Sequence, residues 1–198
     1  MFGLTFFFCC DIFFQKGVVA VRNRIRNMAY VALGAAILVI CSWISIPTPL
    51  IPFTLQTFGV FFLIFYFGPK KGTASLIVYI ALGAIGLPVF SNFTFGFGVL
   101  LGATGGYILG FVASGCLCIA MYSLFGVEWQ VSLVASFLAI LMCYAVGSAR
   151  AMCFVETETS FLPFFVTSLL TFGIFDAVKI VFAYFIARYM KKIKFDRA

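Results

Sequence analysis

Long apolar runs, separated by short groups of polar, glycine or proline residues, make up most of this chain. An apolar run of about 20 residues allows a helix to cross the hydrocarbon core of a bilayer. The pattern predicts six spans, at about 28–46, 55–68, 73–90, 106–125, 129–150 and 161–190. The sixth is long enough to tilt or to project beyond the bilayer, whereas the second is short unless its turn regions dip into the membrane.

The breaks between runs differ in character. "PTPLIP" (47–52) follows the first run, and three prolines in six residues prevent a helix from continuing. Thr54 can then cap the second helix, and "PKKG" (69–72) is predicted to form a turn. After the third run, the glycine-rich stretch 91–106 predicts an irregular segment bordering a cavity or a close-packed turn. We therefore expect irregular or re-entrant loops after the first and third helices.

Composition places this bundle in lipid. The 198 residues are 64% hydrophobic and only 10% charged, with a mean hydropathy of +1.18. A soluble domain of this size needs a larger polar shell. The chain is therefore predicted to be an all-α integral membrane protein with one membrane domain at 28–190. A Phe-rich and basic cytoplasmic or interfacial segment (1–27) precedes it, a basic tail (191–198) follows it, and neither is assigned a function.

The net charge of +7 is attributed to the orientation of the chain in the membrane and not to nucleic-acid binding, because the basic residues flank the apolar runs. Three groups of Lys and Arg precede the first run, follow the second and follow the sixth. Together they hold 11 of the 13 basic residues, and all three groups fall on one side of the membrane. The positive-inside rule puts that side, with both termini, in the cytoplasm.

Several kinds of chemistry are disfavoured. The chain has no histidine, and most of its seven cysteines lie inside apolar runs, so no metal site is expected. "GFGVLL" (96–101) lacks the third glycine of a dinucleotide fingerprint, and "GATGGY" (102–107) lacks the Lys-Ser/Thr of a phosphate loop. With no visible nucleophile–base pair either, we expect neither an enzyme nor a bound cofactor, and no means of hydrolysing ATP.

Two charged residues in the sixth run are the main candidates for binding. Asp176 and Lys179 in "FDAVK" are three residues apart, so they are neighbours on one helical face. A self-neutralising structural pair is one interpretation, but apolar replacements of a buried pair are often neutral or stabilising. Intramembrane ionisable residues usually mark function. An ammonium and a carboxylate together suit a small polar solute that carries both donors and acceptors.

Small residues in the first run form a second candidate surface. Ala32 and Ala36 are four residues apart, so they share a helical face. Such faces let helices approach closely in lipid. The residues alone leave open whether this face packs inside the bundle or docks a separate membrane protein.

Four segments resemble the BioY family, the biotin-specific substrate-binding (S) components of energy-coupling-factor transporters. They are "IPTPLIPFTLQTFGV" (46–60), "GPKKGTASLIVYIALGAIGLPVFS" (68–91), "GATGGYILGF" (102–111) and "DAVK" (176–179). The chain departs from the family at Ala103, where proline is expected, and at Phe175, where a small residue is usual. The resemblance, over about 28–190, implies a six-helix S-component bundle in a bacterial cytoplasmic membrane.

The resemblance also implies a site. The Asp and Lys of the family's D-x-x-K motif line the pocket and correspond to Asp176 and Lys179. A pocket asparagine corresponds to Asn92, although this residue could equally serve a turn. Gln56 could instead be an ordinary polar residue of a first helical turn. Residues in matching segments are expected to line or cover the site: Thr54, Gln56, Thr104, Gly105 and Tyr107.

The implied function is high-affinity capture and uptake of biotin. The implied partners are a T-type transmembrane protein and two cytoplasmic ATPases, and the face with Ala32 and Ala36 resembles the docking stripe of S components. Asp176 is expected to accept a ureido N–H of biotin, and Lys179 could serve either the ureido oxygen or the tail carboxylate. The main alternative is a proton-coupled secondary transporter with Asp176 as its proton carrier. A small intramembrane enzyme is a weaker alternative.

Overall fold

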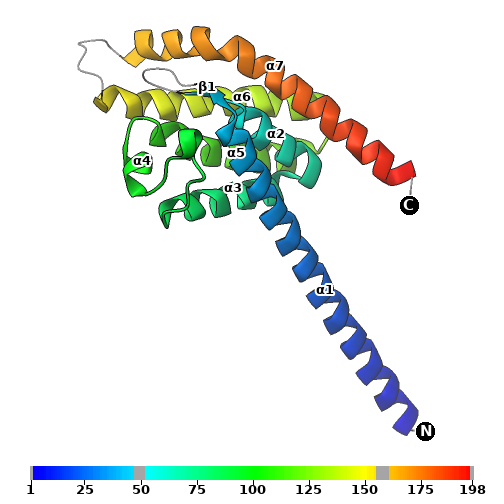
Figure 1. The fold of residues 1–198 in the computed structure, drawn as a ribbon. Coiled ribbons are helices and arrows are strands. Elements are labelled where there is room, and N and C mark those ends of the chain that lie inside the picture. The colour runs from blue at the N-terminus through cyan, green and yellow to red at the C-terminus, as the bar shows by residue number, and fades with distance from the viewer. Residues whose placement is uncertain (1, 47–51, 155–160, 197–198) are drawn as a thin grey trace.

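The computed structural model describes residues 2–46, 52–154 and 161–196. In these ranges it is a bundle of seven α-helices with two short 3₁₀ segments and one pair of very short strands (Figure 1). The helices are α1 (Phe2–Trp43), α2 (Gln56–Phe67), α3 (Pro69–Ala84), α4 (Phe97–Leu101), α5 (Gly105–Phe125), α6 (Trp129–Ala151) and α7 (Phe161–Asp196).

Four helical segments in the described residues are long and apolar enough to cross a membrane. They are Val21–Trp43 of α1, Gly105–Phe125, the segment Trp129–Phe154 that contains α6, and Phe161–Ile193 of α7. The chain is therefore a multi-pass membrane protein. The predicted boundaries of the fourth and fifth runs agree with α5 and α6 to within one residue.

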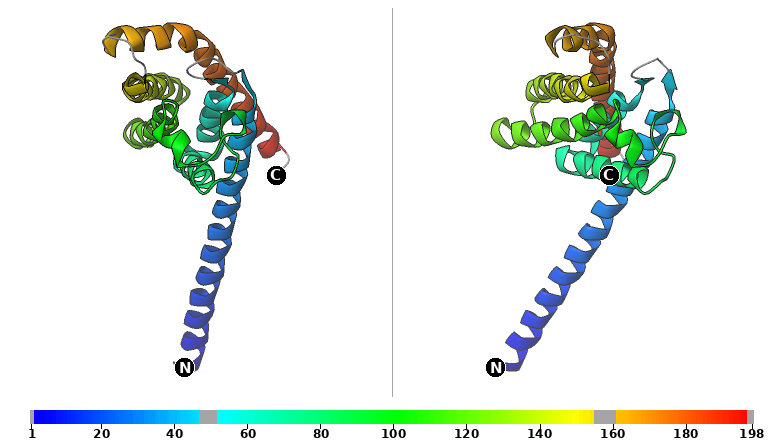
Figure 2. Two further views of the ribbon diagram at one scale, coloured as in Figure 1. Left: turned by 60° about the vertical axis from the view of Figure 1, so that its left-hand side comes forward. Right: turned by 90° about the vertical axis from the view of Figure 1, so that its left-hand side faces the viewer.

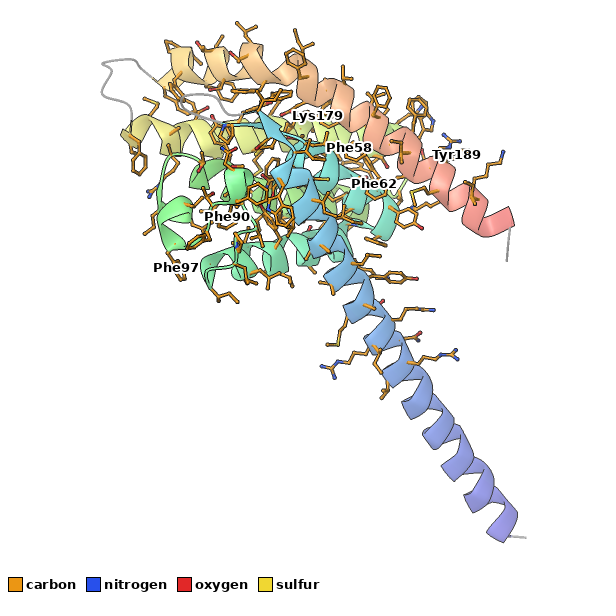
Figure 3. All side chains as sticks on the ribbon, viewed as in Figure 1. Phe58, Phe62, Phe90, Phe97, Lys179 and Tyr189 are labelled. Atoms are coloured by element: carbon orange, nitrogen blue, oxygen red, sulfur yellow. The ribbon has the colours of Figure 1, made fainter. Side chains whose placement is uncertain are left out.

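The second apolar run forms the short helix α2, which is largely buried by its neighbours. Residues 60–65 are all buried, and Phe61 and Leu63 have no exposed surface. Figure 3 shows the aromatic side chains that fill this region, including Phe58 and Phe62, whose stacked ring centroids are 5.9 Å apart. Because protein and not lipid surrounds this helix, its apolar residues extend all around it.

The prediction that 69–72 forms a turn is wrong. The turn is made by Gly68, whose φ of 91° favours glycine, and Pro69 already begins α3. Proline fits the first position of a helix because its missing N–H would have no intrahelical partner there. At its other end α3 stops at Ala84, six residues before the predicted end of this run, and Gly86 follows with a φ of 104°.

The segment after α1, which was predicted to be an irregular loop in an all-α protein, contains a pair of two-residue β-strands. Strand β1 (Ser45–Ile46) pairs antiparallel with β2 (Phe53–Thr54), with Ser45 opposite Thr54. This pairing satisfies backbone groups on both sides of the proline-rich stretch, whose residues 47–51 lie outside the described ranges. The predicted cap by Thr54 is wrong by one residue: Leu55 stands at the N-cap of α2 without a side-chain cap, and the Thr54 hydroxyl accepts the N–H of Gln56 at 3.3 Å from just outside the helix.

The segment between α3 and α5 is irregular, as the glycines suggest. It contains the 3₁₀ turn η1 (Ser91–Phe93) and the five-residue helix α4. Asn92 and Phe93 have φ values of 55° and 58°, so the chain bends sharply through the left-handed region. Arg150 of α6 donates to the carbonyl of Leu101 at the end of α4, and this bond ties the segment to the bundle.

Helices α5 and α6 pack closely against each other along small residues (Figure 2). A Cβ on Gly147 of α6 would lie 2.4 Å from the ring of Tyr107, and one on Gly110 of α5 would lie 2.9 Å from the carbonyl of Cys143. The absence of these side chains lets the two backbones approach. The contact also fixes Tyr107 beside Tyr144, with ring centroids 6.5 Å apart.

Helix α1 extends well beyond the bundle at its N-terminal end (Figures 1 and 2). It runs unbroken from Phe2, so the predicted N-terminal segment and the first span share one helix. Near its other end Gly34 and Ala35 are buried, and a Cβ on Gly34 would collide with Ser75 of α3. Ala32 and Ala36 face outward and are exposed.

We expect Gly147→Ala to destabilise the protein, because its Cβ must displace the ring of Tyr107. Overpacking of this kind costs about 1–3 kcal/mol. Thermal unfolding in detergent measures the effect. The matched control is Gly98→Ala in α4, where a Cβ meets nothing within 4 Å. Equal melting temperatures for the two variants would contradict the packing account.

Candidate functional site

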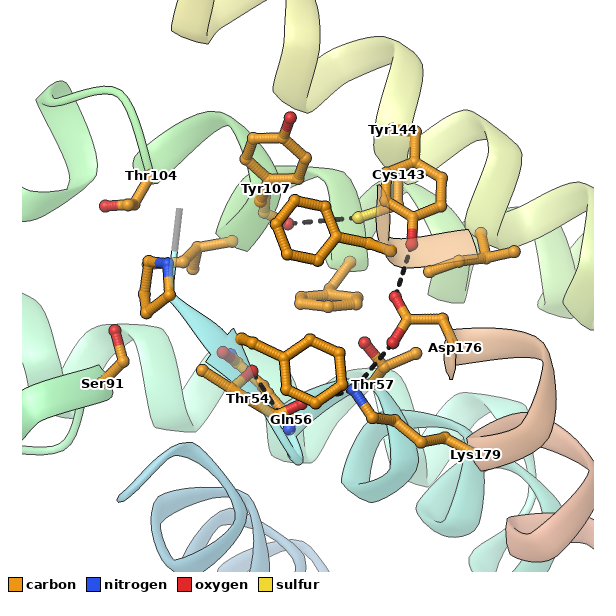
Figure 4. A pocket seen from close by; sticks show the side chains of 16 residues that line it. Thr54, Gln56, Thr57, Ser91, Thr104, Tyr107, Cys143, Tyr144, Asp176 and Lys179 are labelled. Carbon is orange, nitrogen blue, oxygen red and sulfur yellow. Dashed lines mark hydrogen bonds and ion pairs between the residues drawn. The ribbon is translucent and has the colours of Figure 1, made fainter. Parts of the chain in front are cut away.

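A cavity lies where the β2 strand and the start of α2 meet helices α5, α6 and α7 (Figure 4). Its walls are mainly apolar and aromatic, with polar groups at a few points. Such a combination is typical of small-molecule sites, where a few polar groups fix orientation. The lining residues are Pro52, Phe53, Thr54, Gln56, Thr57, Ser91, Thr104, Tyr107, Ile108, Phe111, Ile140, Cys143, Tyr144, Phe172, Asp176 and Lys179.

Asp176 of α7 is the buried acid of this cavity, with 6% of its surface exposed. One carboxylate oxygen, Oδ1, lies 2.9 Å from the Lys179 ammonium. The other, Oδ2, accepts the hydroxyl of Tyr144 at 2.6 Å. Both oxygens therefore have a partner, and each keeps acceptor capacity for a further donor. The expected pairing of the two charged residues on one face of the helix is confirmed.

Lys179 is held by groups from a distant part of the chain. Its Nζ donates to the backbone carbonyl of Thr54 at 2.7 Å and to Asp176 at 2.9 Å. It also lies 3.8 Å from the ring centroid of Phe53, a cation–π contact. An ammonium has three donors, so these two acceptors leave one N–H for a ligand. The strand β2 thus links the charged pair to the irregular segment after α1.

The remaining polar groups stand around the aromatic wall. Gln56 is buried, and its amide donates to the hydroxyl of Tyr79 at 3.4 Å. The hydroxyl of Tyr107 donates to Ser168 of α7 at 3.4 Å. Among the described residues, no three His, Cys, Asp or Glu side chains gather as metal ligands would. The arrangement can bind an uncharged polar or anionic group beside an apolar body.

The structure brings together six of the eight residues predicted for the site. They line the cavity, and the list is Thr54, Gln56, Thr104, Tyr107, Asp176 and Lys179. Asn92 is exposed and outside the lining, and its side-chain oxygen accepts the hydroxyl of Ser45 at 3.0 Å. Gly105 is also outside the lining; it packs so close to Leu100 that a Cβ would collide with the backbone there. The predicted role of these two residues stays a prediction.

Tyr144 and Phe53 were not predicted. Tyr144 is the more informative omission, because it holds the second oxygen of Asp176 from 32 residues away along the chain. The available sequence signal was the hydroxyl of this tyrosine inside the apolar run "LMCYAVG" (141–147), where an aromatic residue is usually interpreted as part of the hydrophobic core. Only the packing of α6 against α7 shows that its hydroxyl meets the carboxylate.

The face with Ala32 and Ala36 lines an apolar groove on the outside of the bundle. Residues of α1 and α3 form it: Ala32, Ala35, Ala36, Val39, Ile40, Trp43, Val78 and Leu82. The two alanines are exposed, so they do not pack inside the described bundle. The groove is separate from the cavity, with which it shares no lining residue.

Comparison with known proteins agrees with this architecture. The sequence model of the BioY family matches residues 15–195. A protein of Thermotoga maritima named "Biotin transporter BioY" is 34% identical over 87% of this chain and 99% of its own length. One of Pyrococcus horikoshii named "Probable biotin transporter BioY" is 33% identical over 83% and 95%. These relatives are named as transporters and not as enzymes.

A solved structure is also similar. It is the S-component for biotin from an ECF-type ABC transporter, with a TM-score of 0.75 and 26% identity over 86% of this chain and 93% of that chain. The match extends over nearly the whole helical bundle. Together with the family match over residues 15–195, it means that this chain belongs to the BioY family and has the fold of an S component.

Proposed function

We propose that this chain captures biotin and serves as the substrate-binding subunit for its uptake through an ECF-type transporter. The observation that carries the proposal is the set Tyr144–Asp176–Lys179, held by hydrogen bonds of 2.6 and 2.9 Å at one side of an aromatic cavity. Curated relatives named for biotin transport and the similar biotin S-component support the same function.

The chemistry of the cavity suits this ligand. Biotin has an apolar bicycle, a ureido group with two N–H donors and one carbonyl, and a carboxylate tail. The carboxylate of Asp176 accepts a ureido N–H, and the free N–H of Lys179 donates to the ureido oxygen or to the tail. The side chains of Phe111, Ile140 and Phe172 surround the apolar body. Thr104 in the lining is a further ligand contact, and Asn92 and Gly105 are kept as members of the site because the family motifs imply them.

The proposed membrane arrangement has six spans: α1, α2, α3, α5, α6 and α7. The irregular segments after α1 and α3 lie at the outer side, where they border the cavity through Thr54 and Ser91. The basic residues beside Gly68, at 16–26 within α1 and at the C-terminal end of α7 lie at the inner side. The positive-inside rule then places both termini in the cytoplasm of a bacterial cell and the chain in its cytoplasmic membrane.

Transport then needs partners, because no nucleotide-binding motif stands in the chain. We propose that a T-type membrane protein docks in the groove around Ala32 and Ala36 and couples the chain to two cytoplasmic ATPases. The groove is apolar, and two alanines one turn apart allow close approach of a partner helix.

The isolated, detergent-purified chain is expected to bind biotin in the nanomolar range. A Kd of about 1 nM corresponds to about −12.3 kcal/mol. Titration calorimetry measures it, with riboflavin and thiamine as vitamins that should produce no heat. Absence of both heat and thermal stabilisation with biotin would overturn the proposed function.

Asp176→Asn and Tyr144→Phe are each expected to weaken biotin binding by roughly 10- to 150-fold. Each removes a hydrogen bond that involves a charged group, worth about 1.5–3 kcal/mol. Calorimetry again gives the affinity. Tyr189→Phe on α7 is the matched control, because this ring is exposed at the far end of the helix (Figure 3). If the two site variants bind normally and only melt earlier, the charged pair is structural.

Ala32→Trp with Ala36→Trp is expected to abolish co-purification with the T-type partner and uptake in cells. The bulky rings keep the partner backbone away. Biotin binding by the isolated variant should stay normal, because the groove is separate from the cavity. The control is Leu33→Trp, an exposed position of α1 outside the groove. Unimpaired uptake by the double variant would show that docking uses another face.

A further inference from the structure

A second cavity lies at the opposite end of α2, between the ends of α2 and α5, the start of α6 and the last turns of α7. It shares no lining residue with the first. The polar and aromatic members of its lining are Phe65, Tyr122, Trp129, Ser132, Tyr184, Arg188 and Lys191. Nothing in the proposed capture of biotin uses these residues.

The charge of this second cavity is one-sided. Arg188 and Lys191 are three residues apart on α7, so they share a helical face, and both line the cavity. Its lining contains no Asp or Glu. Neither cation forms a salt bridge within the described part of the chain. The salt bridge found there joins Lys179 to Asp176. Arg188 uses one N–H on the hydroxyl of Tyr184 at 3.4 Å, which leaves most of its guanidinium donors free.

The inner wall contains a polar group without a partner. Tyr122 is only 8% exposed, and its hydroxyl has no hydrogen-bond partner among the described residues. The neighbouring Ser132 gives its own hydroxyl proton to the carbonyl of Glu128 at 2.8 Å. The Ser132 oxygen keeps acceptor capacity beside this hydroxyl, so the two side chains form one polar spot on the inner wall of the cavity.

The other walls are suited to a lipid. Ile64, Phe65 and Val127 give the cavity an apolar side beside its two cations. Trp129 is exposed, and Trp and Tyr side chains gather at the level of lipid headgroups. A free inorganic anion would match the cations alone, whereas a phospholipid matches both the cations and the apolar wall.

We propose that this cavity binds the phosphate of an anionic phospholipid, with its glycerol and the beginning of its acyl chains against the apolar wall. Arg188 supplies a planar pair of N–H donors for two phosphate oxygens, and Lys191 supplies a point charge. Basic pockets between membrane helices bind lipid headgroups in this way. The site fixes the ends of α2, α5 and α6 against α7 without touching the first cavity.

The test measures melting temperature in detergent with added phosphatidylglycerol, phosphatidylcholine or inorganic phosphate. Phosphatidylglycerol should raise the melting temperature of the wild-type chain by several degrees, because a ligand that binds only the folded state stabilises it. Arg188→Gln with Lys191→Gln should lose at least half of that rise. The matched control, Arg22→Gln with Lys192→Gln, removes two exposed charges outside the cavity and should keep the rise.

Other outcomes would overturn the proposal. They are an undiminished rise in the cavity variant, an equal loss in the control, or an equal rise with phosphatidylcholine. An equal rise with inorganic phosphate alone would overturn a lipid as the occupant. If the double variant does not fold by size-exclusion chromatography, the charge-preserving Arg188→Lys with Lys191→Arg replaces it. Phosphatidylglycerol should still raise the melting temperature of this second variant. If the variant folds normally but phosphatidylglycerol and phosphatidylcholine have equal effects on its melting temperature, a headgroup held mainly by charge is contradicted.

Discussion

The pair formed by the buried Asp176 and the half-buried Lys179 is the interaction on which the rest of the site depends. Two charges taken out of water are stable only when their remaining lone pairs and protons find partners. Here Tyr144 serves the second carboxylate oxygen, and the Thr54 carbonyl and the Phe53 ring serve the ammonium. These partners come from α6 and from β2, so the pair holds three separate parts of the chain in one geometry.

The scaffold around the pair explains why such distant groups arrive together. The close approach of α5 and α6 at Gly147 places Tyr107 and Tyr144 side by side at the cavity. The short β1–β2 pairing fixes the Thr54 carbonyl within hydrogen-bond distance of Lys179 even though a proline-rich stretch precedes it. A rigid frame of this kind reduces the ordering needed when a ligand binds. The site thus depends on backbone contacts as much as on its charged side chains.

The apolar runs predicted most of the fold, because long periodic or continuous hydrophobic segments are the strongest signal in a sequence. They predicted α5 and α6 almost to the residue. The two charges inside the sixth apolar run pointed to Asp176 and Lys179 before the family's D-x-x-K motif did. The predictions failed where local sequence signals conflicted or were too short to detect. Gly68 and Pro69 contain the signals of both a turn and a helix start, and the strands at Ser45 and Phe53 are too short to show alternation. Tyr144 depends on a tertiary contact that no local pattern contains.

Helix α7 connects the two cavities physically. It presents Asp176 and Lys179 to the first cavity and Arg188 and Lys191 to the second. The twelve residues from Asp176 to Arg188 correspond to about 18 Å of helix, which is more than half of a hydrocarbon core. A single helix therefore carries a neutralised pair beside the first cavity and, near its basic end, two cations that form no salt bridge with the described residues. This division follows the energetics of the bilayer, since a charge in the core needs a protein partner, whereas one at the interface can use a lipid headgroup.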